Sequence, residues 1–445
     1  MDYQEIVNYL IKQFQKKGAT AAEAYLEEGR TLQIRVRNGD IESMQQATAK
    51  GVGLRVFSRG KMAFVDSSNL TPQALDSLVE KGVALSQQTS YDEYNILPKP
   101  GPKIASIPIY DPSISKIPLE DKVKLAKKVE KLALEYHKLL KKSGGSSYFD
   151  GETTVYIANS EGISVNYQES YCSFGVEVIA EDKEIMQPGW SSSSARFFSE
   201  LKTPEEVAGK AGELAVSLWN GKPVKSQTAP VVFDRRAGRT FLYGILAAIN
   251  GERVYQKASF LQDMVNKPIA SELVTIIDDG TLPKGLNSRP VDGEGVATSR
   301  KLIVNKGVLK GYLYNTYSAA KSGTTSTGNA TRGGYSSLPG IGPHNFFMLA
   351  GETNPDDMVK EIKEGLYVLG TQGGGANPVN GNFSTGATGL WISEGKKTTP
   401  VANITLAGNM FDILKGIDTV GSDLELDRTI ACPTFRVKQL TIGGV

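Results

Sequence analysis

The chain has 445 residues, of which 40% are hydrophobic and 22% are charged. Chains of this length usually form two or three domains, and the composition is too apolar and too weakly charged for a disordered protein. Fifty Lys and Arg residues against 48 Asp and Glu residues give a net charge of +2, too small to attract nucleic acid or anionic lipid strongly. We therefore expect a folded protein of at least two domains whose main role involves neither nucleic acid nor membranes.

The start of the chain and its cysteines indicate a cytoplasmic protein. Residues 1–5 lack the basic-then-apolar order of a signal peptide, and no apolar stretch approaches the roughly 20 residues that span a bilayer. Cys172 and Cys432 are far apart and match neither a disulfide framework nor a paired-cysteine metal site. Both are expected to be buried, reduced thiols.

The small number of histidines excludes several catalytic classes. His137 and His344 are the only two, so sites built from several imidazoles, including the His-Glu-x-x-His zinc helix, are excluded. No motif around a serine or a cysteine supports a Ser-His-Asp or Cys-His arrangement. His344 has no catalytic partner nearby in sequence, which favours a structural role. The glycine-rich stretches match neither a P-loop nor a dinucleotide-binding motif, so nucleotide binding is unsupported.

In chain order, the pattern first predicts a helix, a meander of strands and a second helix. Apolar residues at three-and-four spacing predict an amphipathic helix over 3–14. Over 23–66 the apolar residues alternate, which predicts about four strands with tight turns at Asn38-Gly39 and Arg59-Gly60. A helix is expected over 72–88, where a proline occupies a first-turn position.

A proline-rich segment then leads to a second copy of this plan. The prolines of 97–118 remove too many backbone donors for regular structure, so the segment is predicted to be an extended connector. The longest helix is expected over 119–142, followed by strands over 147–159 and 171–185 and a further helix over 204–219. Helix and strands are thus followed again by helix and strands.

A change in composition near 220–223 predicts the domain boundary. We expect an α+β protein with an N-terminal domain over 1–220 and a β-rich, glycine-rich C-terminal domain over 228–445. Within the second domain, helices are expected over 237–250 and 356–364, and strands over 274–278, 302–305, 308–314, 345–350, 388–394 and 435–442.

Two features of the second domain leave alternatives open. The glycine run 370–386 permits the close approach of a ligand or of another backbone, and it equally suits a mobile surface loop. The carboxylates Asp278-Asp279, Asp292 and Glu294 could hold a cation or share acid and base roles, but neighbouring glycines favour solvated turns.

A series of short segments is the most specific feature of the sequence. The segments are 159–162 (Asn-Ser-Glu-Gly), Met186, 190–196, 259–261 (Ser-Phe-Leu), Asp278-Asp279, 288–298 (Ser-Arg-Pro-Val-Asp-Gly-Glu-Gly-Val-Ala-Thr), 326–330 (Ser-Thr-Gly-Asn-Ala) and 436–444 (Arg-Val-Lys-Gln-Leu-Thr-Ile-Gly-Gly). Taken together and in this order, they resemble the TldD/PmbA family, and specifically its PmbA (TldE) branch, over essentially the whole chain.

The resemblance implies a metallopeptidase family in which this chain lacks the metal ligands. The TldD-type subunit has an H-E-x-x-x-H helix and a later cysteine ligand, which the PmbA-type subunit lacks. The corresponding positions here are about Leu242, Tyr243 and Ala247, with the cysteine position near Thr419. Zinc ligation needs imidazole, thiolate or carboxylate groups. The resemblance therefore implies no catalytic residue, metal ligand or cofactor in this chain, and zinc in a partner.

The function implied by the resemblance is that of a non-catalytic subunit. Such a subunit joins a TldD-type catalytic subunit in a cytoplasmic complex that degrades or trims small or unfolded peptides. Whether this chain forms a homodimer without that partner is left open. The alternatives are a peptide-binding regulatory protein that acts alone, as in the family's older designation as modulators of DNA gyrase, and an independent hydrolase that uses Asp279, Asp292 or Glu294.

Eight residues within the family-like segments are expected to line the chamber or the subunit contact. They are Ser259, Phe260, Asp279, Arg289, Asp292, Ser326, Gly328 and Asn329. Each also has a structural interpretation of comparable weight. Arg289 and Asp292 could pair with each other, and Gly328 could serve only a turn.

Overall fold

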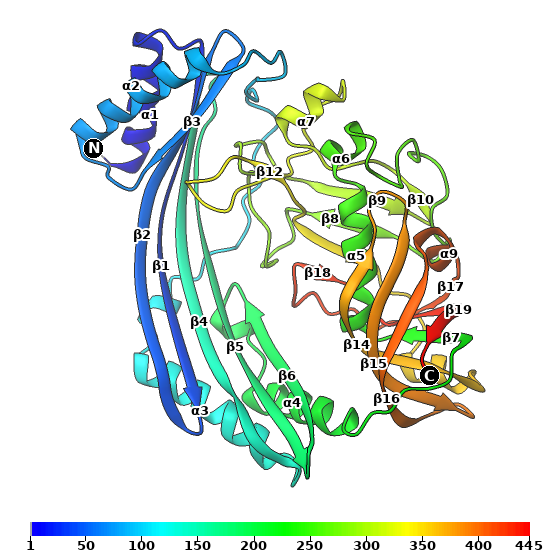
Figure 1. The fold of residues 1–445 in the computed structure, drawn as a ribbon. Coiled ribbons are helices and arrows are strands. Elements are labelled where there is room, and N and C mark those ends of the chain that lie inside the picture. The colour runs from blue at the N-terminus through cyan, green and yellow to red at the C-terminus, as the bar shows by residue number, and fades with distance from the viewer. Residues whose placement is uncertain (1) are drawn as a thin grey trace.

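The computed structural model describes residues 2–445, which form a long, curved sheet beside a second, β-rich half (Figure 1). The long sheet is antiparallel, with strand order β3-β2-β1-β4-β5-β6. Its strands are β1 (Ala21–Arg37), β2 (Asp40–Ser58), β3 (Lys61–Ser67), β4 (Leu140–Asn159), β5 (Ser164–Asp182) and β6 (Ile185–Ala195). The structure is mixed α and β, so the predicted α+β class is confirmed.

The N-terminal meander has three strands where about four were predicted. The turns at Asn38-Gly39 and Arg59-Gly60 are confirmed, since all four residues have positive φ, as tight hairpin turns require. The strand count was wrong because β1 and β2 continue unbroken for 17 and 19 residues. Apolar alternation does not reveal this length, because the residues of β2 from 40 to 50 are all exposed.

Four helices pack at the two ends of these long strands, all on one face (Figure 1). The helices α1 (Tyr3–Lys16) and α2 (Pro72–Gln88) cover one end, and α3 (Leu119–Glu135) and α4 (Pro204–Ser217) cover the other. Both α1 and α4 begin with a capping box, in which Asp2 with Glu5 and Thr203 with Glu206 satisfy the first backbone donors. These helices follow the predicted order.

Two boundaries in this region were predicted wrongly. The helix expected over 119–142 ends at Glu135, because Leu140 is buried and already pairs with Ala180 as the start of β4. The strand expected over 171–185 is the middle of a longer hairpin, since a turn at Lys183 with φ 55° separates β5 from β6. Buried ends of long strands override the local helical pattern here.

The proline-rich connector runs between the two halves of the molecule. Its only regular element is a short 3-10 turn, η1 (Ile114–Lys116), as the lack of backbone donors predicts. The carbonyl of Ile109 accepts from the backbone N–H of Ser170 in β5, and the carbonyl of Pro108 accepts from that of Lys284 in the second half. The segment therefore links the long sheet to the C-terminal half.

The C-terminal half has two large sheets with a helix between them and a small two-stranded sheet. The first sheet has the order β16-β15-β14-β7-β19-β17 and the second β10-β9-β8-β13-β18. Their strands are β7 (Gln227–Phe233), β8 (Ile276–Asp279), β9 (Arg300–Asn305), β10 (Val308–Leu309), β13 (Asn345–Met348), β14 (Glu364–Ala376), β15 (Asn382–Ser393), β16 (Lys396–Asn409), β17 (Ile417–Val420), β18 (Ile430–Ala431) and β19 (Phe435–Gly443). Helix α5 (Arg235–Ala248) contacts β7 and β14 of one sheet and β13 and β18 of the other.

Shorter elements complete this half. They are α6 (Gly251–Tyr255), α7 (Thr316–Lys321), β11 (Ala330–Thr331), β12 (Gly340–Ile341), α8 (Pro355–Lys360) and α9 (Met410–Lys415). A short 3-10 turn, η2 (Phe198–Glu200), lies in the first half, between β6 and α4. The largest hydrophobic core surrounds α5, where the ring of Phe241 contacts those of Phe233, Phe383 and Phe435. No helix of residues 2–445 is long and apolar enough to cross a bilayer. The division into domains 1–220 and 228–445 stays a prediction.

The glycine run 370–386 forms most of a β-hairpin, so the interpretation as a mobile surface loop was wrong. It belongs to β14 and β15, which pair across a turn at 377–381. A side chain at Gly374 would overlap the carbonyl oxygen of Ser384, so a close approach of two backbone segments explains this glycine.

Candidate functional site

Five of the eight predicted residues lie in neighbouring loops between β8 and β13, and a sixth, Asp279, is the last residue of β8. We call the group that these six form with their buried polar neighbours the polar cluster. The cluster comprises Asp278, Asp279, Arg289, Asp292, Glu294, Ser326, Gly328, Asn329 and His344. At its centre, the amide nitrogen of the fully buried Asn329 donates to a carboxylate oxygen of Asp278 at 2.9 Å. The other oxygen of Asp278 accepts from the backbone N–H of His344 at 2.6 Å.

Asp279 and Asp292 are buried, which corrects the expectation of solvated turn residues. Asp279 accepts from the backbone N–H and the hydroxyl of Thr281, both at 2.8 Å. Asp292 accepts three backbone N–H groups, from Glu294, Val296 and Ala330. Burial and the neighbouring Glu294 carboxylate raise the pKa of Asp292 to about 7. Both carboxylates accept hydrogen bonds from their own and neighbouring loops and so stabilise the loop conformation, which is a structural role.

Arg289 joins the polar cluster to the long sheet. Its guanidinium pairs with Glu169 of β5 at 3.4 Å, and Arg196 at the end of β6 pairs with the same carboxylate at 3.0 Å. The suggestion that Arg289 pairs with Asp292 was therefore wrong. The sequence could not reveal the true pair, because 120 positions separate Arg289 from Glu169.

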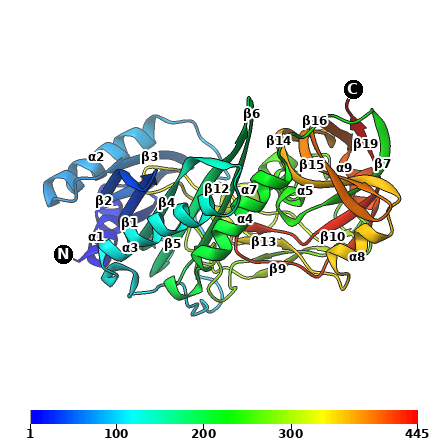
Figure 2. The same cartoon turned by 90° about the horizontal axis from the view of Figure 1, so that it is seen from below.

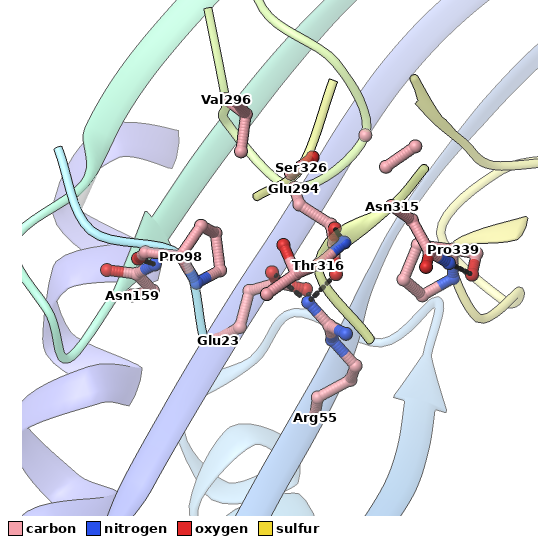
Figure 3. A network of polar contacts seen from close by, with 12 residues as sticks. Glu23, Arg55, Pro98, Asn159, Glu294, Val296, Asn315, Thr316, Ser326 and Pro339 are labelled. Atoms are coloured by element: carbon pink, nitrogen blue, oxygen red, sulfur yellow. Dashed lines mark hydrogen bonds and ion pairs between the residues drawn. The ribbon is translucent and has the colours of Figure 1, made fainter. Parts of the chain in front are cut away.

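A second set of buried charges also joins the polar cluster to the long sheet (Figure 3). Glu294 of the polar cluster pairs with Arg55 of β2 at 2.9 Å and accepts the backbone N–H of Thr316 at 2.8 Å. Arg55 also pairs with Glu23 of β1 at 2.5 Å, and Glu23 in turn accepts from Arg332. All four charged side chains are at most 6% exposed. We call Glu23, Arg55, Glu294 and Arg332 the interdomain charge network.

Ser326 and Gly328 shape the loop that carries Asn329. The Ser326 hydroxyl accepts from the backbone N–H of Gly328 at 3.2 Å. Gly328 has φ +68°, and a side chain there would lie 2.7 Å from the carbonyl oxygen of Ala297. Only glycine fits this position without displacing the neighbouring loop.

Ser259 and Phe260 lie apart from the polar cluster, at the far end of α5. The Ser259 hydroxyl donates to the carbonyl of Ala248, the last residue of α5, at 2.6 Å. The ring of Phe260 packs edge-on against that of Phe411, with 5.4 Å between centroids. Both residues therefore have clear structural contacts, and their place in a chamber or subunit contact stays a prediction.

His344 gives the polar cluster a measurable pH dependence. Its Nε2 lies 2.7 Å from the carbonyl oxygen of Gly328, which can only accept, so the neutral ring carries its proton on Nε2. Burial lowers the pKa of His344, assisted by the positive charge of Lys301 and opposed by Asp278. The fold therefore favours the neutral imidazole, and this contribution to stability is present above about pH 6.5 and is lost as the pH falls below it.

The histidine NMR signals test this prediction directly. Because the chain has only His137 and His344, their imidazole Hε1 protons give two signals, and the variant His137→Gln assigns them. We expect the midpoint of the His344 signal below pH 6.5. A midpoint at or above 6.5 would contradict the burial argument.

The side chains on α5 do not fit a zinc ion. Leu242 is fully buried in the apolar core, Tyr243 is 56% exposed, and Ala247 offers no donor atom. Thr419 lies on β17, and burial raises the pKa of the Cys432 thiol far above its usual range, which disfavours a thiolate ligand. Within residues 2–445, no group of three or more His, Cys, Asp or Glu side chains is arranged to hold a metal ion. Cys172 and Cys432 are both free and buried, as predicted.

A cavity of about 270 Å³ lies between the two halves of the molecule, beside the first turns of α5, and we call it the basic pocket. Its walls come from β6 and α4 on one side and from α5, β14, β15 and the 425–432 segment on the other. In Figure 2, α4 and β6 lie next to the C-terminal half. Arg235, Arg236 and Arg239 of α5 line it together with Arg428.

The basic pocket was not predicted from the sequence, although one signal for it was present. Three arginines stand in the first turn and a half of α5, where the helix dipole disfavours positive charge. Such a placement indicates that other groups nearby compensate the charge. Those groups, including Glu425, lie almost 200 positions away and could not be identified from periodicity.

Three family models together match most of the chain. PmbA/TldA metallopeptidase domain 1 matches residues 22–86, the central domain matches 112–218, and the C-terminal domain matches 226–444.

Individual proteins are similar over most of their lengths. Metalloprotease PmbA of Escherichia coli O157:H7 is 29% identical over 429 residues, which cover 95% of this chain and 92% of that protein. The metalloprotease PmbA homolog of Buchnera aphidicola subsp. Baizongia pistaciae is 32% identical over 325 residues, covering 73% and 70% of the two chains. A crystal structure from Bacteroides thetaiotaomicron, described as that of a candidate modulator of DNA gyrase, has a TM-score of 0.92 at 26% identity and covers 100% of both chains.

Proposed function

Since the chain belongs to the PmbA/TldD family of metallopeptidases, we propose that it is the non-catalytic, TldE-type subunit of a cytoplasmic metallopeptidase complex. In this proposal a TldD-type partner holds zinc and cleaves small or unfolded peptides. The present chain completes the enclosure in which those peptides are bound.

The observation that supports this proposal is the chemistry of α5. The positions that correspond to the metal-binding helix carry a buried leucine, an exposed tyrosine and an alanine. Leucine and alanine have no lone pair to offer a metal, and no carboxylate stands where the general base of a metallopeptidase is needed. The core around Leu242 is nevertheless well packed. A chain that keeps the family's fold without these groups suits a structural or substrate-binding subunit.

Peptidase assays of the separate and mixed subunits test the proposal. An unstructured peptide is incubated with this chain, with a TldD-type protein of the same organism, and with the two together, and the zinc content of each sample is measured. We expect no cleavage and no stoichiometric zinc with this chain alone, and chelator-sensitive cleavage by the mixture. The matched control is the mixture with a partner variant that lacks its metal-binding histidines, which should be inactive.

Two outcomes would overturn the proposal. Cleavage by this chain alone would indicate an unrecognised site, and substitution of Asp279, Asp292 or Glu294 would then locate it. A chain that neither associates with the partner nor changes its activity would favour a regulatory protein that acts alone.

A further inference from the structure

The basic pocket contains more positive than negative side chains. Seven Lys and Arg residues line it, against four Asp and Glu residues. Most of these charges are paired. Glu425 accepts from both Lys202 and Arg235, and Lys202 also pairs with Asp427 at 3.0 Å. Although burial alone would raise it, the pKa of Glu425 is held at about 2 by Lys202 and Arg235, so this carboxylate is ionised and fully engaged.

Three further cations of the pocket have carboxylate partners as well. Lys210 lies 3.7 Å from Glu425. Arg236 pairs with Asp234 at 3.3 Å, and Lys397 pairs with Asp356 outside the pocket at 3.2 Å. Glu213, which also lines the pocket, is exposed and forms no ion pair with the described residues. The carboxylates of the pocket are thus either committed to these pairs or directed to solvent.

Arg239 and Arg428 are left without a carboxylate partner among residues 2–445. Arg239 donates from Nε to the carbonyl of Arg236 at 3.2 Å, and no bond is formed by its two terminal nitrogens. Arg428 donates from one terminal nitrogen to the carbonyl and the hydroxyl of Ser192 on β6, at 3.3 and 2.6 Å. Both guanidinium groups therefore retain free donors in the same cavity.

The two arginines also repel each other. Burial lowers the pKa of Arg239, and the positive charge of Arg428 lowers it further. Two half-buried like charges in one cavity cost free energy unless an anion lies between them. Apolar side chains, including Leu369 and Leu390, form part of the same wall. Such a combination suits an anionic group carried on a partly apolar molecule.

We propose that the basic pocket binds a carboxylate of a peptide, with Arg239 and Arg428 as its ligands. The planar, two-oxygen geometry of a carboxylate matches the paired donors of a guanidinium group. That the carboxylate belongs to a peptide rests on the proposed function. The C-terminal carboxylate and an acidic side chain share this chemistry.

Calorimetric titration of this chain alone distinguishes the sources of the anion. Three N-acetylated octapeptides of Ala, Gly and Ser are compared, one with a free C-terminus, one amidated, and one amidated with a single internal Glu. We expect the free-acid peptide, the Glu peptide or both to bind at least about tenfold more tightly than the neutral amide, a factor typical of one charge-assisted contact. Tighter binding of the free acid assigns the C-terminus, and tighter binding of the Glu peptide assigns a side chain.

Arginine variants connect this binding to the pocket. Arg239→Gln and Arg428→Gln should each remove the preference for the charged peptide, whereas Arg253→Gln, an exposed arginine on α6 outside the pocket, should leave it unchanged. Circular dichroism checks that each variant is folded, and the comparison of peptides on the unmodified chain needs no variant at all.

Three results would overturn the inference. These are equal affinity for all three peptides, a preference that survives both arginine variants, and binding of inorganic phosphate without any binding of peptide carboxylates. All of these results concern this chain alone. The subunit role is tested by activity in the mixture, so the failure of one proposal is distinguishable from the failure of the other.

Discussion

Replacement of Glu23 by glutamine is expected to lower the free energy of unfolding by about 3–5 kcal/mol, the range for breaking a buried ion pair. Glu23 lies between Arg55 and Arg332 in the interdomain charge network and is 1% exposed. Burial alone would raise the pKa of Glu23, but the two arginines hold it below its usual range, so the carboxylate is ionised in the fold. Glutamine keeps the shape and removes the charge, which leaves Arg55 with Glu294 as its one carboxylate partner (Figure 3). Arg332 then loses its only ion pair among residues 2–445.

Chemical denaturation, followed by tryptophan fluorescence and circular dichroism, measures this effect. The matched control is Glu80→Gln, which breaks the exposed pair between Glu80 and Lys17. Exposed pairs of this kind contribute less than about 1 kcal/mol. If the two variants lost similar amounts of stability, the network would contribute no more than a surface ion pair.

Replacement of Gly53 by alanine is expected to cost about 3 kcal/mol, the upper end of the range for overpacked contacts. Gly53 lies in β2, where a side chain would overlap the backbone carbonyl oxygen of Tyr335. A side chain at Gly51 would overlap the ring of the same tyrosine, so both glycines leave room for the 333–337 loop to pack against the sheet. The loop must move away from the sheet to admit a methyl group, because the obstacle is backbone and not a flexible side chain.

Gly209→Ala is the matched control, with an effect of opposite sign. Gly209 lies inside α4, and a side chain there would meet no atom within 4 Å. Alanine is favoured over glycine in a helix by about 1 kcal/mol, so this variant should be more stable than the parent chain. Thermal unfolding of the two variants would show shifts in opposite directions. Equal stability of Gly53→Ala and the parent would indicate that the loop adjusts freely.

Much of the N-terminal fold could be predicted from the sequence because its signals are local. The pairs Asn38-Gly39 and Arg59-Gly60, which adopt positive φ, indicated the hairpin turns. A proline or a capping residue indicated the start of α2 and α4. The ends of the long strands were missed. Leu140 pairs with Ala180 of β5 and packs in the core under α3 and α4, and these contacts are not encoded in neighbouring residues.

The candidate site was harder to predict, because its charges come together from distant segments. Asp292 and Glu294 stand among turn residues and were expected in solvent, yet both are buried, and Glu294 pairs with Arg55 of the long sheet, about 240 positions earlier. Arg239 and Arg428 were not singled out at all, since neither belongs to a recognisable motif. A sequence pattern identifies types of residue at fixed spacing, but the pairing of buried charges depends on how the two halves are joined.

The length of β1 has a consequence for the local unfolding of the protein. Alternate residues on one face of this strand enter two separate cores, with Ala22, Ala24 and Leu26 packed under α1 and α2, and Leu32, Ile34 and Val36 packed under α3 and α4. One continuous strand therefore belongs to two cooperative units that can lose their helices independently. Amide protons at the two ends of β1 should then exchange with solvent at different rates.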